Sequence, residues 1–173
     1  MADNPASEQH YIDPYRQLSP SRSFEDHVHH LYRVLREQYS GIDRFSLARY
    51  QADTGYLSSL TCAGDDTRLL DGYQMLLENV PSLQSLVASP GIRVVGDMRK
   101  FRVEELPAHS AALLGQGYRS SLTMPMMSDG RLLGMLFLNA RTINYFTAPM
   151  ASYCTLWGHW VEQLLAQESL VGN

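Results

Sequence analysis

The stretch 117–139 constrains the fold of this chain more than any other segment. It contains two apolar runs, at 122–127 and 132–138, on either side of an Asp129-Gly130 pair. Such a pair between two strand-like runs predicts a β-hairpin, because a tight turn of the primed type requires positive φ. Neither run alternates regularly with polar residues, so we expect both faces of the hairpin to be covered.

Small polar side chains occur at alternate positions of the hairpin, and therefore on one face of each expected strand. Ser121 and Thr123 share one face of the first expected strand. Asn139 is the last of the alternate positions 135, 137 and 139, which share one face of the second. One face of the hairpin is therefore apolar throughout, while the other mixes apolar and small polar groups. The mixed face is either the wall of a pocket or a second core face whose hydroxyls bond to nearby backbone.

Length, charge and cysteine content narrow the class of protein. The chain has 173 residues, enough for one domain with a single hydrophobic core. Its formal charge is −4 and Lys100 is its only lysine, so no nucleic-acid partner is expected. Cys62 and Cys154 form neither a disulfide framework nor a metal-spacing pair, which favours the reducing cytoplasm. No apolar run reaches membrane-spanning length and no signal pattern is present, so no membrane association is expected.

The N-terminal part predicts a tail and then a helix. Residues 1–20 carry prolines without an apolar period, which indicates a flexible tail before a domain at 21–170. Ser23 is typical of a helix N-cap, and an apolar stripe predicts a helix over 24–39. No further metal ligand is evident beside the three histidines of this helix, which we interpret as a solvated face: His27, His29 and His30.

The C-terminal part predicts a long helix that begins near Thr147. Its apolar stripe is broader than packing on one sheet face requires, because it contains Trp157, Trp160, Leu164 and Leu165. Leaving such side chains in water is costly, so the stripe predicts a homodimer built on the terminal helices. In that dimer the stripe packs against the first helix of a second subunit, through Leu31 and Tyr32.

The middle of the chain predicts strands and short helices. We expect strands over 44–51, 56–62 and 92–96, a loop over 97–106, and helices over 69–79, from Pro81 and from Pro107. This order predicts an α+β fold with a central antiparallel sheet. The N- and C-terminal helices should lie on one face, and the connecting helices and loops on the other.

This order of elements resembles that of a GAF domain, the small-molecule-binding sensory module of cyclic-nucleotide phosphodiesterases, phytochromes and many bacterial regulators. The resemblance spans about residues 23–167 and is strongest in GYRSSLTMPMMSDGRLLGMLFLNARTINYFT, residues 117–147. That segment is similar to the family's Gly-x-Arg-Ser start, its two apolar strands around an Asp-Gly turn, and its Phe-Thr before the last helix. Val95-Gly96-Asp97 is similar to the family's third strand and the aspartate that closes it.

The resemblance implies a ligand pocket between the sheet and the segment 97–117, where the polar parity of the hairpin also points. Six residues are expected to line one cavity: Asp97, Phe101, His109, Ser121, Thr123 and Asn139. Pro107-x-His109 is similar to the phytochrome segment whose histidine packs against the bilin. Ala108, however, stands where plant-type members carry the cysteine that attaches it. A bilin, a haem ligated by His109, and a histidine that merely bonds to backbone are the alternatives.

These features predict a sensory or regulatory domain that binds a small molecule of unknown identity and signals through a helical dimer. The alternative is a ligand-free GAF domain that serves as a dimerisation scaffold. The family also includes free methionine sulfoxide reductases, but Cys62 and Cys154 lack a resolving partner in the expected pocket loops. No Ser-His-Asp order, P-loop or HExxH motif occurs, so we expect neither enzymatic activity nor a metal site. A signalling output domain is expected on a separate chain or after residue 173.

Overall fold

An antiparallel sheet forms the centre of the computed structural model, which describes residues 9–16, 18, 22–64, 73–89, 91–101 and 108–171. Within these residues the sheet has six strands in the order β3-β2-β1-β6-β5-β4. The strands are β1 Arg44–Gln51, β2 Tyr56–Gly64, β3 Gln74–Leu76, β4 Arg93–Val95, β5 Ser120–Ser128 and β6 Arg131–Ala140. The helices are α1 Phe24–Gln38, α2 Pro81–Ala88, α3 Ala108–Gly115 and α4 Ala148–Val171, with 3₁₀ turns η2 Leu77–Asn79 and η3 Met98–Lys100.

The structure contains the hairpin expected around Asp129 and Gly130. β5 and β6 are antiparallel neighbours, and Ser128 pairs with Arg131 across a two-residue turn. Asp129 and Gly130 both have positive φ, 49° and 75°, as a primed turn requires. Because β6 also pairs with β1 and β5 with β4, the hairpin lies inside the sheet.

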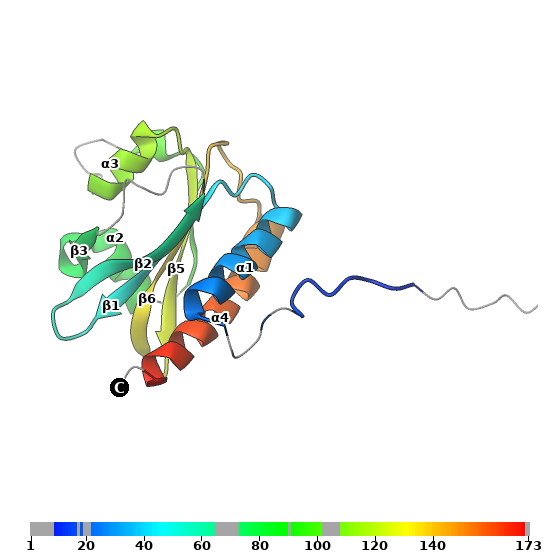
Figure 1. The fold of residues 1–173 in the computed structure, drawn as a ribbon. Helices are drawn as coiled ribbons and strands as arrows, with labels where there is room; N and C mark the ends of the chain where they lie inside the picture. The colour runs from blue at the N-terminus through cyan, green and yellow to red at the C-terminus, as the bar shows by residue number, and fades with distance from the viewer. Residues whose placement is uncertain are drawn as a thin grey trace, which may run out of the picture.

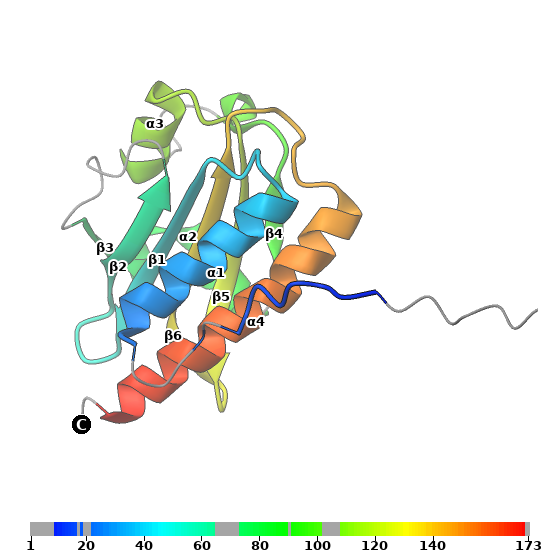
Figure 2. The same cartoon turned by 45° about the vertical axis from the view of Figure 1, so that its right-hand side comes forward.

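α1 and α4 lie side by side across one face of the sheet (Figures 1 and 2). Even-numbered residues of the hairpin belong to the apolar core beneath them: Leu122, Met124, Met126, Leu136 and Leu138. Trp157 of α4 is buried in this core, and its indole Nε1 donates a 2.9 Å hydrogen bond to the carbonyl oxygen of Leu31 in α1. Gly158 allows close approach of α4, since a Cβ there would meet the sulfur of Met124 at 2.6 Å. This face is a close-packed core.

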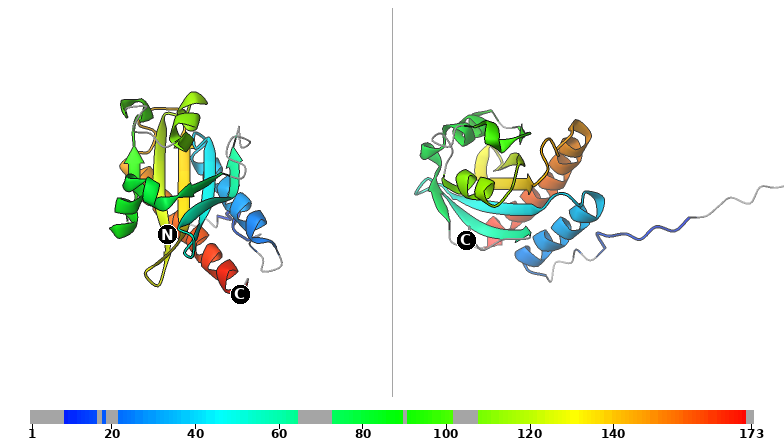
Figure 3. Two further views of the ribbon diagram at one scale, coloured as in Figure 1. Left: turned by 90° about the vertical axis from the view of Figure 1, so that its left-hand side faces the viewer. Right: turned by 90° about the horizontal axis from the view of Figure 1, so that it is seen from above.

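The opposite face of the sheet is covered by elements between β2 and β5, including α2 and α3 (Figures 1 and 3). A smaller apolar cluster joins Leu83 of α2 to Leu57 and Met135 on the sheet. The sheet curls around these elements, as the view from above shows (Figure 3). The arrangement confirms the expected α+β fold, with the terminal helices together on one face and the connecting elements on the other.

The helix expected over 69–79 is wrong for the described part of that segment. Residues 65–72 lie outside the described residues, and Gln74–Leu76 form β3, which pairs with β2. The turn η2 follows directly. Leucine, methionine and glutamine favour helices, but the edge of β2 offers backbone partners and Met75 gains a buried position. Tertiary pairing therefore outweighs local propensity.

The interpretation of the α1 histidines as a solvated face is wrong for His27 and His30, which are both buried. The segment before α1 explains this for His30, because its Nε2 donates to the carbonyl oxygen of Pro14 at 2.7 Å. Its Nδ1 accepts from Arg33 at 3.0 Å. Over the described ranges, no three His, Cys, Asp or Glu side chains gather closely enough to hold a metal ion.

The apolar stripe of α4 divides between core and surface. Four residues assigned to the dimer interface are buried within the chain's own core: Trp157 and Leu165 of α4, and Leu31 and Tyr32 of α1. Because those two α1 residues are covered by their own domain, they cannot receive a second subunit, and this part of the expected interface is wrong. Leu156 and Trp160 remain 63% and 59% exposed on α4. Among the described helices, none is long and apolar enough to cross a membrane.

Candidate functional site

A cavity of about 60 Å³ lies on the sheet face opposite the terminal helices. Strand register brings its wall together, because Asn139 of β6 pairs with Arg44 of β1 on one side and with Ser121 of β5 on the other. The polar lining consists of Arg44, Ser46, Ser59, Arg93, His109, Ser110, Ser121, Thr123 and Asn139. The remaining lining is apolar or aromatic: Ala48, Leu57, Tyr73, Met75, Met98, Leu113 and Phe137. We call this space the inner cavity.

A second space, of about 190 Å³, adjoins the inner cavity and is called the outer chamber here. The two share part of their lining, namely Arg93, Met98, His109, Ser110 and Ser121. The outer chamber extends to α2, where Ser82 and Leu83 contribute to its wall. The shared residues make the inner cavity and outer chamber two parts of one site.

His109, at the start of α3, lies between two aromatic rings of the site. Ring centroids of Tyr73 and Phe137 are 5.6 and 6.3 Å from its imidazole. Tyr73 Oη is 3.4 Å from Nδ1, and Ser110 Oγ is 3.2 Å from Nε2. Burial, followed by the nearby positive charges of Arg44 and Arg93, lowers the pKa of His109 to about 4. The imidazole is therefore neutral near pH 7, with one nitrogen as donor and the other as acceptor.

Arg44 places a cation in the wall of the inner cavity. It begins β1 and is only 2% exposed. Its Nη1 donates a 2.9 Å hydrogen bond to Oδ1 of Asn139, which is itself buried. Burial lowers the pKa of Arg44 from its ordinary value, but a guanidinium still keeps its proton at physiological pH. The sheet therefore holds a buried positive charge.

Arg93 contributes a second cation from the opposite side of the site. It begins β4 and pairs with Thr123 of β5. Its Nε is buried without a hydrogen-bond partner, and burial also lowers the pKa of this side chain. Arg93 lines both the inner cavity and the outer chamber, so it stands where the two parts of the site meet.

The structure brings four of the six expected site residues into the lining of the inner cavity: His109, Ser121, Thr123 and Asn139. They come from α3, β5 and β6. Phe101 lines the outer chamber only and is 47% exposed. Ser121 and Asn139 lie on the face away from the terminal helices, on the side that their parity indicates.

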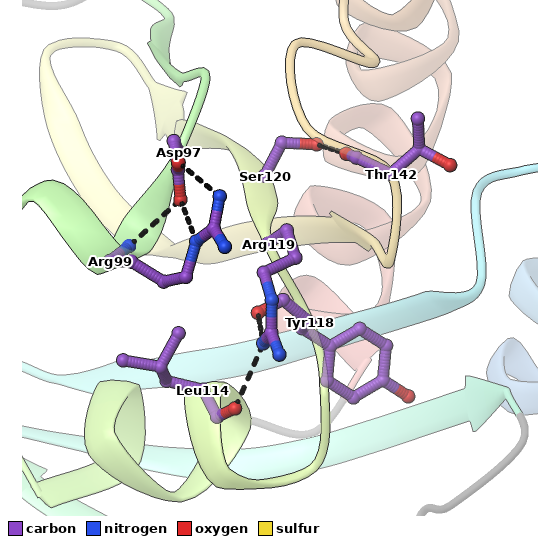
Figure 4. Close-up of polar contacts among 7 residues, drawn as sticks. All are labelled: Asp97, Arg99, Leu114, Tyr118, Arg119, Ser120 and Thr142. Carbon is purple, nitrogen blue, oxygen red and sulfur yellow. Dashed lines mark hydrogen bonds and ion pairs between the residues drawn. The ribbon is translucent and has the colours of Figure 1, made fainter.

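Asp97, the sixth expected residue, lines neither part of the site. Its carboxylate accepts hydrogen bonds from the backbone N, Nε and Nη2 of Arg99, at 3.1, 2.9 and 2.7 Å (Figure 4). The side-chain bonds from Arg99 are the main cause that lowers the pKa of Asp97 to about 2. In this structure Asp97 caps η3 and pairs within its own turn, which accounts for its absence from the cavity wall.

Arg119 ties α3 to the sheet and so helps to fix the position of His109. Its Nη1 donates to the carbonyl oxygens of Leu114 and Tyr118, at 3.1 and 2.9 Å (Figure 4). Its backbone N donates to Ala140 of β6, and its carbonyl oxygen accepts from Met98 of η3. One residue thus connects the end of α3, the η3 turn and the central hairpin.

The two cysteines lie on opposite sides of the sheet. Cys62 of β2 pairs with Ser46 and shares the sheet face of the inner cavity. Cys154 of α4 is completely buried in the core beneath the terminal helices. Burial raises the pKa of the Cys154 thiol to about 12, so this group is not a thiolate at neutral pH.

Sequence reasoning misses four aromatic or charged residues of the site: Arg44, Arg93, Tyr73 and Phe137. A signal exists for two of them. Phe137 has the parity of Asn139, and Arg44 alternates with Phe45 and Leu47, which face the terminal helices. Tyr73 directly precedes the three-residue strand β3 and Arg93 begins the three-residue strand β4, where no periodicity indicates a face.

Solved structures share this fold at low sequence identity. A GAF domain/HD domain protein from Geobacter sulfurreducens aligns with a TM-score of 0.71 and 13% identity over 86% of this chain and 95% of its own. The chromophore-binding domain of an unusual bacteriophytochrome from R. palustris gives 0.64 and 15%, over 91% and 58%. A type II free methionine-R-sulfoxide reductase from Thermoplasma acidophilum gives 0.64 and 12%, over 83% and 93%. This chain therefore spans little more than half of the bacteriophytochrome structure.

The family can be assigned from the sequence as well as from the fold. A search of curated proteins gives no significant match. The family model of the GAF domain, in contrast, matches residues 24–153, from the start of α1 into α4. That range covers well over half of the chain and includes both walls of the site. The chain belongs to the GAF domain family.

Proposed function

We propose that this GAF domain is a sensory or regulatory module that binds a small molecule in the inner cavity and outer chamber. One observation carries the proposal: spaces of about 60 and 190 Å³ stay unfilled on one face of the sheet. On the other face of the same strands the helix-covered core is closely packed, and the open space of about 290 Å³ found there lies beside it, between α4 and β5. A domain retained only as a dimerisation scaffold has no reason to leave this volume open, because filling it with large side chains would add stability.

The chemistry of the lining supports the same proposal. Small-molecule sites are mostly apolar and contain a few polar groups that fix orientation. Here Leu57 and Phe137 supply apolar wall, while Ser121, Thr123 and Asn139 supply hydroxyl and amide groups. The R. palustris neighbour is a chromophore-binding domain. We extend to this chain only the class of a small organic ligand, because the inner cavity suits a smaller molecule than a bilin or haem.

We propose that the domain does not catalyse a reaction. A thiol-based reductase needs a thiolate and a resolving thiol that can meet. Cys154 is protonated and enclosed by the helical core, and the sheet separates it from Cys62. An assay of free methionine sulfoxide reduction with dithiothreitol tests this point, and measurable turnover would contradict it.

Ligand binding is tested by native mass spectrometry of the freshly purified full chain. We expect a mass increment that is present under gentle ionisation and lost on denaturation. Ser121→Phe is the matched variant, because Ser121 lines both parts of the site and a phenyl ring would fill them. Circular dichroism checks that this variant is folded. No increment in wild type, with no stabilisation by any compound of a metabolite panel, would favour the scaffold.

We propose that the domain transmits ligand binding through a homodimer formed by the outer face of α4. Leu156 and Trp160 lie one helical turn apart, and Leu170 of the same helix is 78% exposed. Large apolar side chains that are exposed together on one helix typically mark an interaction surface. The interface proposed here is thus α4 against α4 of a second copy.

Sedimentation velocity at micromolar concentration tests the dimer. Wild type should sediment as a dimer and Trp160→Glu as a folded monomer, because a carboxylate in an apolar interface is costly. Gln84→Glu adds the same charge at an exposed position of α2, on the other side of the sheet, and should remain dimeric. A monomeric wild type would overturn this interface and leave ligand binding unaffected.

A further inference from the structure

The site contains one buried and one half-buried cationic side chain, Arg44 and Arg93, without an anionic partner among the described residues. Within that part of the chain, neither Arg44 nor Arg93 forms an ion pair with a carboxylate. The side-chain hydrogen bond of Arg44 goes to the neutral amide of Asn139, at 2.9 Å. The buried Nε of Arg93 has no hydrogen-bond partner. Both guanidinium groups therefore retain donors that the described residues do not satisfy with a negative charge.

The strand order directs the two arginines towards a common space. β1, β6, β5 and β4 are consecutive neighbours, so β1 and β4 lie about 14 Å apart, on a strand spacing of about 4.8 Å. Arg44 is level with Val95, so Arg93 lies two residues farther along the sheet. The bond from Arg44 to Asn139 shows that its guanidinium leans inwards, over β6. Both side chains line the inner cavity, with Ser121 and Thr123 on the strand between Asn139 and Arg93.

Burying a charge is unfavourable unless a counter-charge accompanies it, and arginine cannot escape the cost by losing its proton. Two cations that no described carboxylate neutralises are therefore expected at a site whose counter-charge comes from a ligand. Residues that bind ligands commonly reduce the stability of the free protein in this way.

We propose that the cavity binds a small organic acid whose anionic group, carboxylate or phosphate, is held between Arg44 and Arg93. This inference rests on the proposed function and specifies its ligand class. The planar guanidinium fork matches both kinds of anion through paired N–H donors. The hydroxyls of Ser121 and Thr123 lie beside the anion, and the wall formed by Leu57, Met75 and Phe137 receives a compact apolar body.

His109 completes the site as a neutral group. His109 lines the same cavity as the two arginines, and their charges lower its pKa after the larger effect of burial. A neutral imidazole can exchange one hydrogen bond with the ligand without adding a third positive charge. Its stacking partners Tyr73 and Phe137 hold the ring at the side of the cavity.

The first test needs no ligand. In ligand-free protein, Arg93→Met should raise the melting temperature by about 2–4 °C, because it removes a half-buried charge that no described carboxylate compensates and keeps the aliphatic stem. Arg131→Met, at an exposed position at the start of β6, is the control and should leave the melting temperature unchanged. A lower melting temperature for Arg93→Met would show that Arg93 is a structural residue and would overturn the proposal.

The second test measures binding to the full chain by calorimetry and thermal shift at constant ionic strength. The probes are benzoate, succinate and inorganic phosphate at millimolar concentration, with benzamide as the uncharged counterpart of benzoate. At least one anion should stabilise wild type, benzamide should not, and Arg93→Met should weaken binding about 10- to 100-fold. Arg131→Met should bind as wild type does. A response to phosphate alone would assign the site to phosphate groups, and a response to carboxylates alone would assign it to organic acids.

The two proposals fail in different ways. If benzamide binds as well as benzoate, or if no anion binds while native mass spectrometry finds an uncharged ligand, the anion inference is overturned and small-molecule binding stands. If neither anions nor a native ligand bind, and Ser121→Phe is more stable than wild type, both proposals are overturned and the scaffold is favoured.

Discussion

The two faces of the sheet are formed by the same strands but differ in packing and polarity. Leu47 and Ser46 are adjacent in β1, yet Leu47 belongs to the close-packed core under α1 and α4 while Ser46 lines the inner cavity. β5 shows the same division between Leu122 and Thr123. The core of the helix-covered face is apolar and closely packed, with an open space only beside it, between α4 and β5, whereas the other face keeps open volume, buried hydroxyls and the buried cation of Arg44. The difference in packing predicts that stability is concentrated on the first face, while the second face carries the proposed binding site.

The largest difference between the faces is expected for Trp157→Ala. Trp157 is buried, packs edge-on against Phe45 with ring centroids 6.0 Å apart, and bonds to Leu31. Its removal should lower the free energy of unfolding by about 3–5 kcal/mol, measured by urea denaturation. Phe101→Ala removes a ring of the half-exposed outer chamber and should cost less than about 1 kcal/mol. Equal losses in the two variants would contradict the division.

The second prediction concerns pH and the cavity face. The pKa of His109 is about 4 in the folded chain and near 6.5 when unfolded, so only the unfolded state takes up this proton between those values. Stability is therefore complete above about pH 6.5 and falls as the pH drops towards 4, by at most about 3 kcal/mol from this group. His109→Gln should remove that part of the pH dependence. Identical slopes of unfolding free energy against pH in wild type and variant would exclude a buried neutral His109.

The third prediction isolates the contact between Arg44 and Asn139. Asn139→Ala removes the carbonyl acceptor of a buried guanidinium and should lower the free energy of unfolding by about 1.5–3 kcal/mol. Asn139→Asp supplies a carboxylate in its place, so it should restore stability at neutral pH and abolish anion binding by occupying Arg44 internally. Chemical denaturation and calorimetry measure the two effects. An alanine variant as stable as wild type would show that Arg44 finds another partner.

The smallest expected effect is that of Ser46→Ala. The Ser46 hydroxyl faces the inner cavity and not the close-packed core, so its loss should change the free energy of unfolding by less than about 0.5 kcal/mol. Leu47→Ala, one position along the same strand, should cost about 2–5 kcal/mol. The pair is a direct test, because backbone environment is shared and only the face differs. A comparable cost for both would mean that the cavity face also carries packing energy.

The hairpin and the terminal helices could be predicted from sequence because their signals are local. Asp129-Gly130 specifies its turn by backbone conformation, and the stripe of α1 follows from helical periodicity. The mixed parity of Ser121, Thr123 and Asn139 likewise indicates which face of the hairpin is polar. These residues line the inner cavity because β5 and β6 have side chains of period two.

The arginines of the site could not be predicted because their role depends on strand order. Arg44 meets Asn139 only because β1 pairs with β6, 95 residues away along the chain. Arg93 lies on a three-residue strand whose face is set by its pairing with β5. β3 is missed for a related reason, since Met75 is placed by the edge of β2 and not by its neighbours in sequence. Asp97 is predicted from the local segment Val95-Gly96-Asp97, but its carboxylate pairs with Arg99, two positions later, and does not line the cavity.

β5 is a single strand that separates the inner cavity from the helix-covered core. The side chains of Ser121 and Thr123 face the inner cavity, and those of Leu122 and Met124 face the core, although all four belong to the same strand. Near the end of the strand, the backbone N of Met127 donates to the buried carboxylate of Glu162 in α4, at 2.7 Å. Because closely packed groups leave little room for displacement, we expect a shift of β5 to be passed to α4. The longest helix of the described chain is thus joined by a direct hydrogen bond to the strand that lines the site.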